Sequence, residues 1–169
     1  MNHSRRGEAL RGRHGVPRRI DFPDGAAEVR TVNANGTVDS VTDTTGNKTC
    51  FEYDAMRRPS RVTYTSEAEW GVCDTSSYAQ TTIAFTPGHA AVYGMPAGHW
   101  RRTALTGNAR HVVVFDALWR PVVEQWVDLG DYANTLREEV TRYDASGRIA
   151  FRSHPSNTHG QLHHADTTL

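Results

Sequence analysis

The stretch Lys48-Thr-Cys-Phe-Glu-Tyr-Asp-Ala-Met-Arg-Arg-Pro-Ser-Arg-Val-Thr-Tyr64 decides the fold, because its pattern returns twice along the chain. The second copy runs from Arg110 to Glu124 and the third from Val140 to Arg152. Each copy reads as a strand, a short segment opened by an aspartate, and a second strand. In the first copy, Phe51 and Tyr53 before the turn alternate with polar neighbours, as Val62 and Tyr64 do after it. This pattern predicts two strands joined by a tight turn, which is a β-hairpin.

Each copy opens its turn with an aspartate, and these are Asp54, Asp116 and Asp144. A carboxylate at this position accepts backbone N–H groups and closes the turn. In the third copy Gly147 stands where a type I turn followed by a bulge needs a positive φ. Arg57 and Trp119 occupy the same position in the other two copies. Their turns must either absorb a strain of about 1–2 kcal/mol or adopt another shape.

A fourth, weaker copy lies upstream, from Arg30 to Asp43. Here Asn33 replaces the aspartate, and Asn35-Gly36 supplies the residues that best tolerate a positive φ. The 21 residues from Val32 to the tyrosine before Asp54 fit an array of short structural repeats. Later spacings of 62 and 28 residues are irregular, and one or two degenerate units are needed to fill the longer gap.

These residues resemble the Rhs repeats, which are also called YD repeats. The resemblance covers roughly residues 19 to 155 and includes the flanking turn segments 22–25 and 42–47. Its specificity comes from repetition, because a single Tyr-Asp pair carries no information. The positions that carry the repeat motif are Asn33, Gly36, Tyr53, Asp54, Arg58, Phe115, Asp116, Arg120, Tyr143, Asp144, Gly147 and Arg148.

The resemblance implies a structural scaffold. In this family, successive hairpins join edge to edge in a strip that spirals into a hollow shell. The shell encloses a C-terminal toxin in bacterial polymorphic toxins and belongs to a cell-surface adhesion protein in teneurins. A chain of 169 residues holds too few repeats to close a shell, so we expect a non-catalytic fragment of one. The implied partners are other YD repeats or a neighbouring polypeptide that completes the sheet, and full-length relatives are expected to be secreted or on the cell surface.

Composition sets broad limits on function. The formal net charge is zero and 22% of the residues are charged, which favours neither a nucleic-acid binder nor an enzyme acting on acidic substrates. We expect a basic disordered leader at 1–18, a hairpin region at 19–155 and a flexible tail at 156–169. No apolar run approaches the roughly 20 residues that cross a membrane. The leader also lacks the apolar segment of a secretory signal.

The expected fold is all-β, a series of antiparallel β-hairpins that form an open twisted strip. Thr81 to Thr86 is predicted as a strand that ends at Pro87-Gly88. Glu124 to Arg142 is predicted as a long hairpin connection, because Gly130-Asp131 interrupts its apolar residues. Open sheet edges template association, so the isolated chain is expected to self-associate or to fold poorly.

Cys50 and Cys73 are the only cysteines. Two cysteines 23 residues apart form neither a metal ligand set nor a redox motif. Cys50 precedes Phe51 in an alternating strand pattern, which favours a buried or half-buried thiol. A disulfide is the alternative if the two strands meet.

Four residues are candidates for ligand binding: Tyr93, His99, Trp100 and Trp119. The first three lie in a predicted loop at 93–100, where aromatic faces beside polar donors suit a carbohydrate or a partner protein. The alternative is that these side chains pack the loop onto the sheet. A carbohydrate- or protein-binding surface is therefore the second hypothesis for function.

The candidates for a metal-dependent hydrolase are His154, His159, His163, His164 and Asp166. Histidine is a common metal ligand, but ligands need rigid support, and Pro155 and Gly160 indicate a flexible tail here. The sequence also lacks a nucleophile elbow and a phosphate-binding glycine loop. We therefore expect no catalytic residue, no metal and no cofactor, with this hydrolase as a distant third hypothesis.

Overall fold

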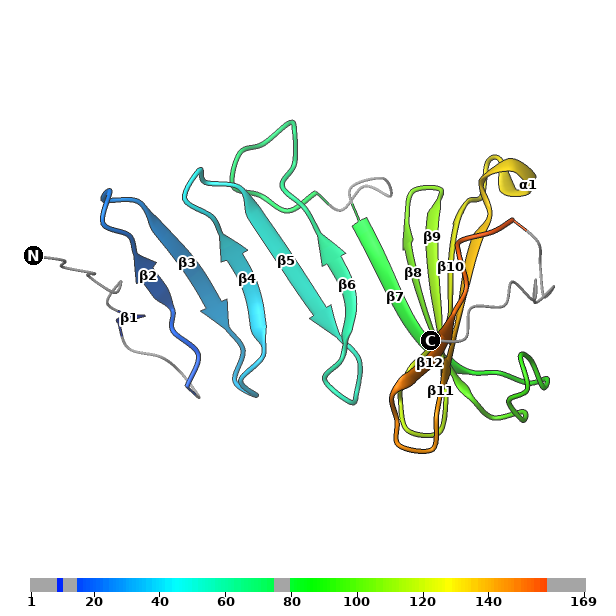
Figure 1. The fold of residues 1–169 in the computed structure, drawn as a ribbon. Coiled ribbons are helices and arrows are strands. Elements are labelled where there is room, and N and C mark those ends of the chain that lie inside the picture. Colours follow the sequence, from blue (N-terminus) through cyan, green and yellow to red (C-terminus); the bar gives the residue numbers. More distant parts are fainter. Residues whose placement is uncertain (1–8, 11–14, 75–79, 158–169) are drawn as a thin grey trace, which may run out of the picture. The chain divides into compact units, whose positions relative to one another are not determined.

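The computed structural model describes residues 9–10, 15–74 and 80–157. Regular structure in these residues is nearly all β-strand, with one short helix, which confirms the all-β prediction. The chain divides into two compact units, Met1–Thr81 (unit 1) and Thr82–Leu169 (unit 2). Within each unit, consecutive strands lie side by side in chain order, as expected for successive hairpins (Figure 1).

Unit 1 is built from short strands, each antiparallel to the next. They are β1 (Ala9–Leu10), β2 (Arg19–Asp21), β3 (Ala27–Val32), β4 (Val38–Thr42), β5 (Lys48–Tyr53) and β6 (Pro59–Thr63). The register places Thr31, Ser40, Cys50 and Thr63 in one row across four strands. Among the described hydrophobic residues of unit 1, only Val32 is buried. Unit 1 therefore has very little apolar core.

Unit 2 continues the hairpin order with longer strands. They are β7 (Gln80–Pro87), which begins just before the boundary, β8 (Trp100–Thr106), β9 (Ala109–Phe115), β10 (Pro121–Asp128), β11 (Arg137–Tyr143) and β12 (Ile149–Arg152), with α1 (Tyr132–Thr135) between β10 and β11. The pairings from β8 to β12 are all antiparallel.

The core of unit 2 lies on one face of β9, β10 and β11. Val114, Val123 and Val140 stand directly opposite one another across the three strands, and Val112, two positions from Val114 on β9, belongs to the same cluster. Val123 is 1% exposed. These β-branched residues pack well against cross-strand neighbours, which explains why this part of the sheet carries the core.

The prediction for Glu124 to Arg142 is wrong, because β10 and β11 occupy most of this segment. β10 ends at Asp128, and Gly130 and Asp131 lie in the short turn between it and α1. The hydroxyl of Thr135 accepts a hydrogen bond from the backbone N–H of Asp128 at 2.9 Å, which closes the turn. By contrast, β7 confirms the strand predicted at Thr81 to Thr86.

The leader predicted at residues 1–18 is not wholly irregular. Its residues Ala9–Leu10 form β1 and pair with Ile20 and Arg19 of β2. Residues 1–8 and 11–14 of the leader, and 158–169 of the tail, lie outside the described residues.

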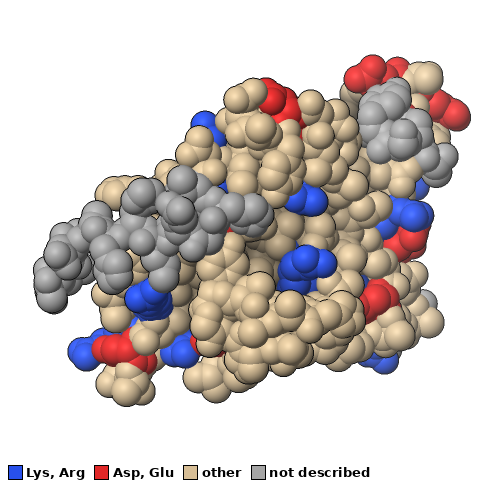
Figure 2. Space-filling view, turned by 90° about the vertical axis from the view of Figure 1, so that its right-hand side faces the viewer, with Lys and Arg blue, Asp and Glu red and all other residues tan. Residues whose placement is uncertain are grey.

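Charged side chains do not gather into one large patch on the face drawn in Figure 2. Small groups of either sign are scattered over a mostly uncharged surface. On this face, the described residues show no concentration of positive charge of the kind that binds nucleic acid backbones. In the described part of the chain, no helix is long and apolar enough to cross a membrane.

Candidate functional site

Six turns in the described residues share one backbone hydrogen-bond pattern. In each, the N–H of the first residue donates to the carbonyl of the fifth, and the N–H of the fourth donates to the carbonyl of the first, at 2.8–3.1 Å. The turns begin at Phe22, Asn33, Asp43, Asp54, Asp116 and Asp144. The repeat recognised in the sequence is therefore a repeated turn in the structure.

The fourth residue of each of these turns has a positive φ. It is 82° at Gly147, 61° at Arg57 and 60° at Trp119. The strand pairing shifts register beside these turns, as expected for a type I turn followed by a bulge. Arg57 and Trp119 thus keep the turn shape and absorb the strain.

Exchanging the residues at this fourth position should change stability in opposite directions. Gly147→Val forces a β-branched residue to φ 82° and should lower the free energy of unfolding by about 1–2 kcal/mol. Arg57→Gly removes the strain of a side chain at φ 61° and should raise it by about 0.5 kcal/mol, after the added entropy of glycine in the unfolded chain. Urea titration of each variant measures both changes.

The matched control is Ala145→Val, one residue into the exposed turn that contains Gly147. It places the same valine side chain in the turn without requiring a positive φ and should stay within about 0.5 kcal/mol of the parent. If Gly147→Val and Ala145→Val are equally stable, the positive φ at Gly147 is not what the turn requires.

The aspartate of the repeat holds its turn from inside. Asp116 Oδ1 accepts the backbone N–H groups of Leu118 at 2.9 Å and Arg120 at 3.0 Å, while Oδ2 accepts Arg120 Nε at 2.8 Å. The same three contacts recur in the turns that begin at Asp54 and Asp144. Hydrogen bonds from the arginine backbone, and then from its guanidinium, hold the pKa of both of these carboxyls below its usual value.

The tyrosine of the motif links each of two hairpins to the strand before it. The hydroxyl of Tyr53 donates to the carbonyl of Val38 at 2.7 Å, and that of Tyr143 donates to the carbonyl of Pro121 at 3.0 Å. Both carbonyls belong to the first residue of the preceding strand. The guanidinium of Arg120 also lies 4.3 Å from the centre of the Tyr143 ring. The tyrosine of the motif therefore connects one repeat to the one before it.

The second copy replaces this tyrosine with Phe115, which has no hydroxyl. Its ring lies 5.6 Å from that of Trp119, which stacks on Trp100 at 5.9 Å with an interplanar angle of 17°. Trp119 is 50% exposed and Trp100 37% exposed. Two of the four candidate ligand-binding residues are thus brought together on one face of unit 2.

The other two candidates lie elsewhere, so the four do not form one platform. Tyr93 reaches the face that carries the valine core, where its hydroxyl donates to Glu138 Oε2 at 2.5 Å. His99 packs against Gly88 so closely that a Cβ there would lie 2.2 Å from its ring. The imidazole Nδ1 of His99 lies 3.1 Å from the carbonyl of Pro96. His99 therefore closes the base of the loop.

Glu138 is a charged residue in the interior, 3% exposed. Besides Tyr93, its carboxylate accepts a hydrogen bond from the amide of Gln125 at 2.6 Å. Burial, followed by the contact with Glu138, raises the pKa of the Tyr93 hydroxyl well above its usual value. These bonds hold the loop of residues 88–98, called here the loop wall, against β10 and β11.

A cavity of about 810 Å³ opens between the loop wall and the sheet of unit 2. Its size falls within the range of small-molecule sites. It is lined by Val92, Tyr93, Gly94, Met95, Asp116, Arg120, Val122, Val140, Thr141, Arg142 and Tyr143.

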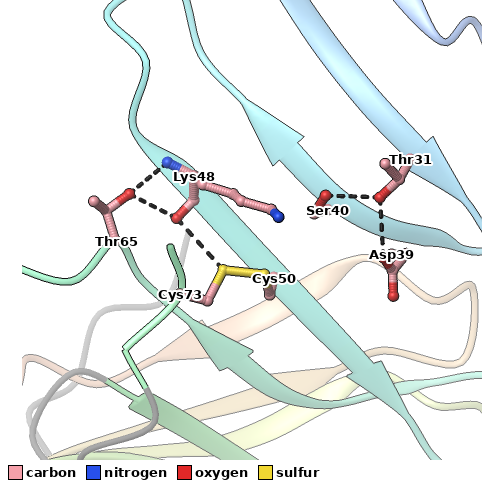
Figure 3. Close-up of a disulfide and its surroundings, with 7 residues drawn as sticks. All are labelled: Thr31, Asp39, Ser40, Lys48, Cys50, Thr65 and Cys73. Carbon is pink, nitrogen blue, oxygen red and sulfur yellow. Dashed lines mark hydrogen bonds between the residues drawn. A yellow bond between two sulfur atoms is a disulfide. The ribbon is translucent and has the colours of Figure 1, made fainter. Parts of the chain in front are cut away.

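In unit 1, Cys50 and Cys73 form a disulfide, so the prediction of a thiol at Cys50 is wrong. Cys73 reaches β5 because the segment after β6 folds back over the sheet. There the hydroxyl of Thr65 accepts the backbone N–H of Lys48 and donates to its carbonyl at 2.8 Å (Figure 3). The backbone of Cys73 also bridges to that of Thr65. The sequence could not show this reversal, because no turn motif marks it.

The sequence offered little warning of the cavity or of Glu138. Glu138 stands in an alternating strand pattern, on the core side, where an apolar residue is expected. A charged residue at such a position is the feature of the sequence that could have indicated a buried polar contact.

Among the described residues, no three histidine, cysteine, aspartate or glutamate side chains are placed to hold a metal ion. The tail candidates His159, His163, His164 and Asp166 lie outside the described residues.

No protein-family model matches this sequence, and no curated protein resembles it closely enough to count as a match.

Proposed function

We propose that this chain is a non-catalytic structural module, a piece of an Rhs/YD-repeat shell. The observation that carries the proposal is the repeated turn. In it the aspartate binds the arginine, and the tyrosine hydroxyl binds the backbone of the preceding strand. The aspartate, the arginine and the tyrosine of the motif therefore hold the hairpins together. Such a module extends a sheet strand by strand, and in longer relatives it encloses a C-terminal toxin or serves cell-surface interaction.

Two further features support the proposal. A disulfide persists in oxidising environments such as the periplasm or the cell exterior, where shells of this kind are expected. The strand order ends at β12, and no described strand pairs with its outer edge. Such an edge pairs readily with another strand, which is how the next hairpin of a shell would attach.

The test is whether the outer edge of β12 mediates association. Ile149 pairs with Tyr143 of β11, and the corresponding positions of the other two copies hold Pro59 and Pro121. Because proline has no N–H, pairing with the neighbouring strand does not need a donor at this position, and the N–H of Ile149 points outward. Ile149→Pro removes this donor without removing a bond to β11. We expect the parent chain to associate as its concentration rises, and Ile149→Pro to shift it towards monomer, as measured by size-exclusion chromatography with light scattering.

Ile149→Val is the matched control, because it keeps the N–H and should associate like the parent. A parent chain that stays a cooperatively folded monomer at every concentration contradicts the proposal. So does equal association of Ile149→Pro and Ile149→Val, since the contact then lies away from this edge.

The second candidate function is a carbohydrate- or protein-binding surface, favoured by the exposed stack of Trp100 and Trp119. Tyr93 cannot join it, because its hydroxyl is committed to Glu138 on the core face. A glycan array probed with the parent and with Trp119→Ala separates the candidates. Binding that Trp119→Ala abolishes supports the surface, and an array without signal removes glycans from consideration.

A further inference from the structure

We propose that the cavity under the loop wall is a binding site for an organic anion with an apolar body, such as an aryl or alkyl carboxylate. The site uses residues of unit 2 alone. It does not depend on a neighbouring hairpin, so it stands apart from the proposed structural role.

The walls of the cavity are held in place before any ligand arrives. Val92 and Met95 exchange backbone hydrogen bonds at 3.1 and 2.8 Å, which makes a tight turn with Tyr93 at φ 52° and Gly94 at φ 78°. A tyrosine at positive φ is strained, and its hydroxyl bond to Glu138 opposes relaxation of the turn. A preformed wall lowers the entropic cost of binding.

The body of the ligand is set by the apolar lining. Val122 and Val140 come from the sheet, Met95 faces them from the loop wall, and the Tyr93 and Tyr143 side chains add aromatic surface. A pocket with this lining, and few polar groups, favours an apolar ligand that carries one orienting group.

The charge of the ligand is set by Arg142. Only three charged residues line the cavity, Asp116, Arg120 and Arg142, and the first two form an ion pair at 2.7 Å. In the described part of the chain, Arg142 forms no ion pair, and its guanidinium lies 5.6 Å from the Phe151 ring. The buried carboxylate of Glu138 does not line the cavity. One positive charge is therefore left for a ligand, and a guanidinium pairs well with a carboxylate or sulfonate.

The probe is 8-anilinonaphthalene-1-sulfonate, a fluorescent anion with an aromatic body, titrated into the full chain. We expect saturable binding that 4-phenylbutyrate displaces and 4-phenylbutylamine, a cation of similar shape, does not. Arg142→Gln keeps most of the side-chain bulk and should weaken binding about fivefold or more. Arg137→Gln, on the same strand but outside the cavity, should change binding less than twofold.

Several results overturn the site. These are displacement by the amine as effectively as by the carboxylate, equal binding by Arg142→Gln and the parent, and the absence of saturable binding at millimolar probe. A circular dichroism spectrum of Arg142→Gln that matches the parent excludes misfolding as the cause of weaker binding. Because association through β12 is measured separately, failure of this site leaves the structural proposal intact, and the converse also holds.

Discussion

Asp116→Ala is expected to lower the free energy of unfolding of unit 2 by about 2–3 kcal/mol. The Asp116 side chain is only 19% exposed and accepts two backbone N–H groups as well as the guanidinium of Arg120. Hydrogen bonds to a charged group contribute roughly 1.5–3 kcal/mol, and removing the acceptor leaves the donors unsatisfied. The same bonds hold Trp119 at its strained φ of 60°, so the turn loses what keeps its shape. Urea titration followed by tryptophan fluorescence measures the loss.

Asp116→Asn is the matched variant. It retains an oxygen for the two backbone N–H groups but loses the ionic contact with Arg120, so its loss should be intermediate. If Asp116→Ala and Asp116→Asn unfold at the same urea concentration as the parent, the carboxylate does not hold the turn, and the repeat motif lacks the energetic role given to it here.

The dependence of stability on pH tests the same interaction. Burial acts to raise the pKa of the Asp116 carboxyl, but the hydrogen bonds from Arg120 and Leu118 outweigh it, so the pKa lies below its ordinary value of 3.8. A carboxyl with a lowered folded pKa stabilises the fold above its unfolded pKa, and that stability is lost as the pH falls through the folded value. Stability of the parent should therefore hold from pH 7 to about pH 5 and fall below about pH 4, with a smaller fall in Asp116→Ala.

The hairpin order was predictable because its signals are local. Asp54, Asp116 and Asp144 close turns within five residues, and Gly147 meets a backbone requirement that the sequence states directly. Strand alternation then predicts the pairing of each arm with the next. Trp119 and Arg57 show the limit of local reasoning, since the sequence left open whether the turn shape survives without glycine. It survives because the aspartate bonds are made in all three copies.

The candidate sites depended on contacts between residues far apart in the sequence. The contact of Tyr93 with Glu138 spans 45 residues, and no spacing rule links them. The four proposed ligand residues looked like one cluster because three lie within eight positions, yet the loop turns Tyr93 towards the core face and leaves Trp100 at the start of β8. No pattern in the sequence marks Arg142, because a single arginine in a strand becomes informative only when the cavity beside it is known.

Loss of the disulfide is expected to have the largest effect on unit 1. Cys50 lies in the row with Ser40 and Thr63, which are 3% and 7% exposed, so the interior of this unit is filled by small polar groups where unit 2 has valines. A sheet with so little apolar core gains little from hydrophobic burial. Closing a loop of 23 residues restricts the unfolded chain by an amount equivalent to about 3 kcal/mol. Reduction should therefore destabilise unit 1 by about that amount.

Hydrogen exchange measured by mass spectrometry localises this effect. With a reductant present, peptides from residues 48–74 should exchange roughly a hundredfold faster, whereas peptides from residues 109–128 should change little, because the bond constrains only unit 1. The double variant Cys50→Ser/Cys73→Ser is the control, and it should exchange fast under both conditions and ignore the reductant. Unchanged exchange at 48–74 after reduction would mean that the turns and the bonds of Thr65 to Lys48 suffice to hold this segment. Unit 1, which has so little apolar core, would then be stabilised by something other than the disulfide. Association through the outer edge of β12 could not supply that stability, because β12 belongs to unit 2.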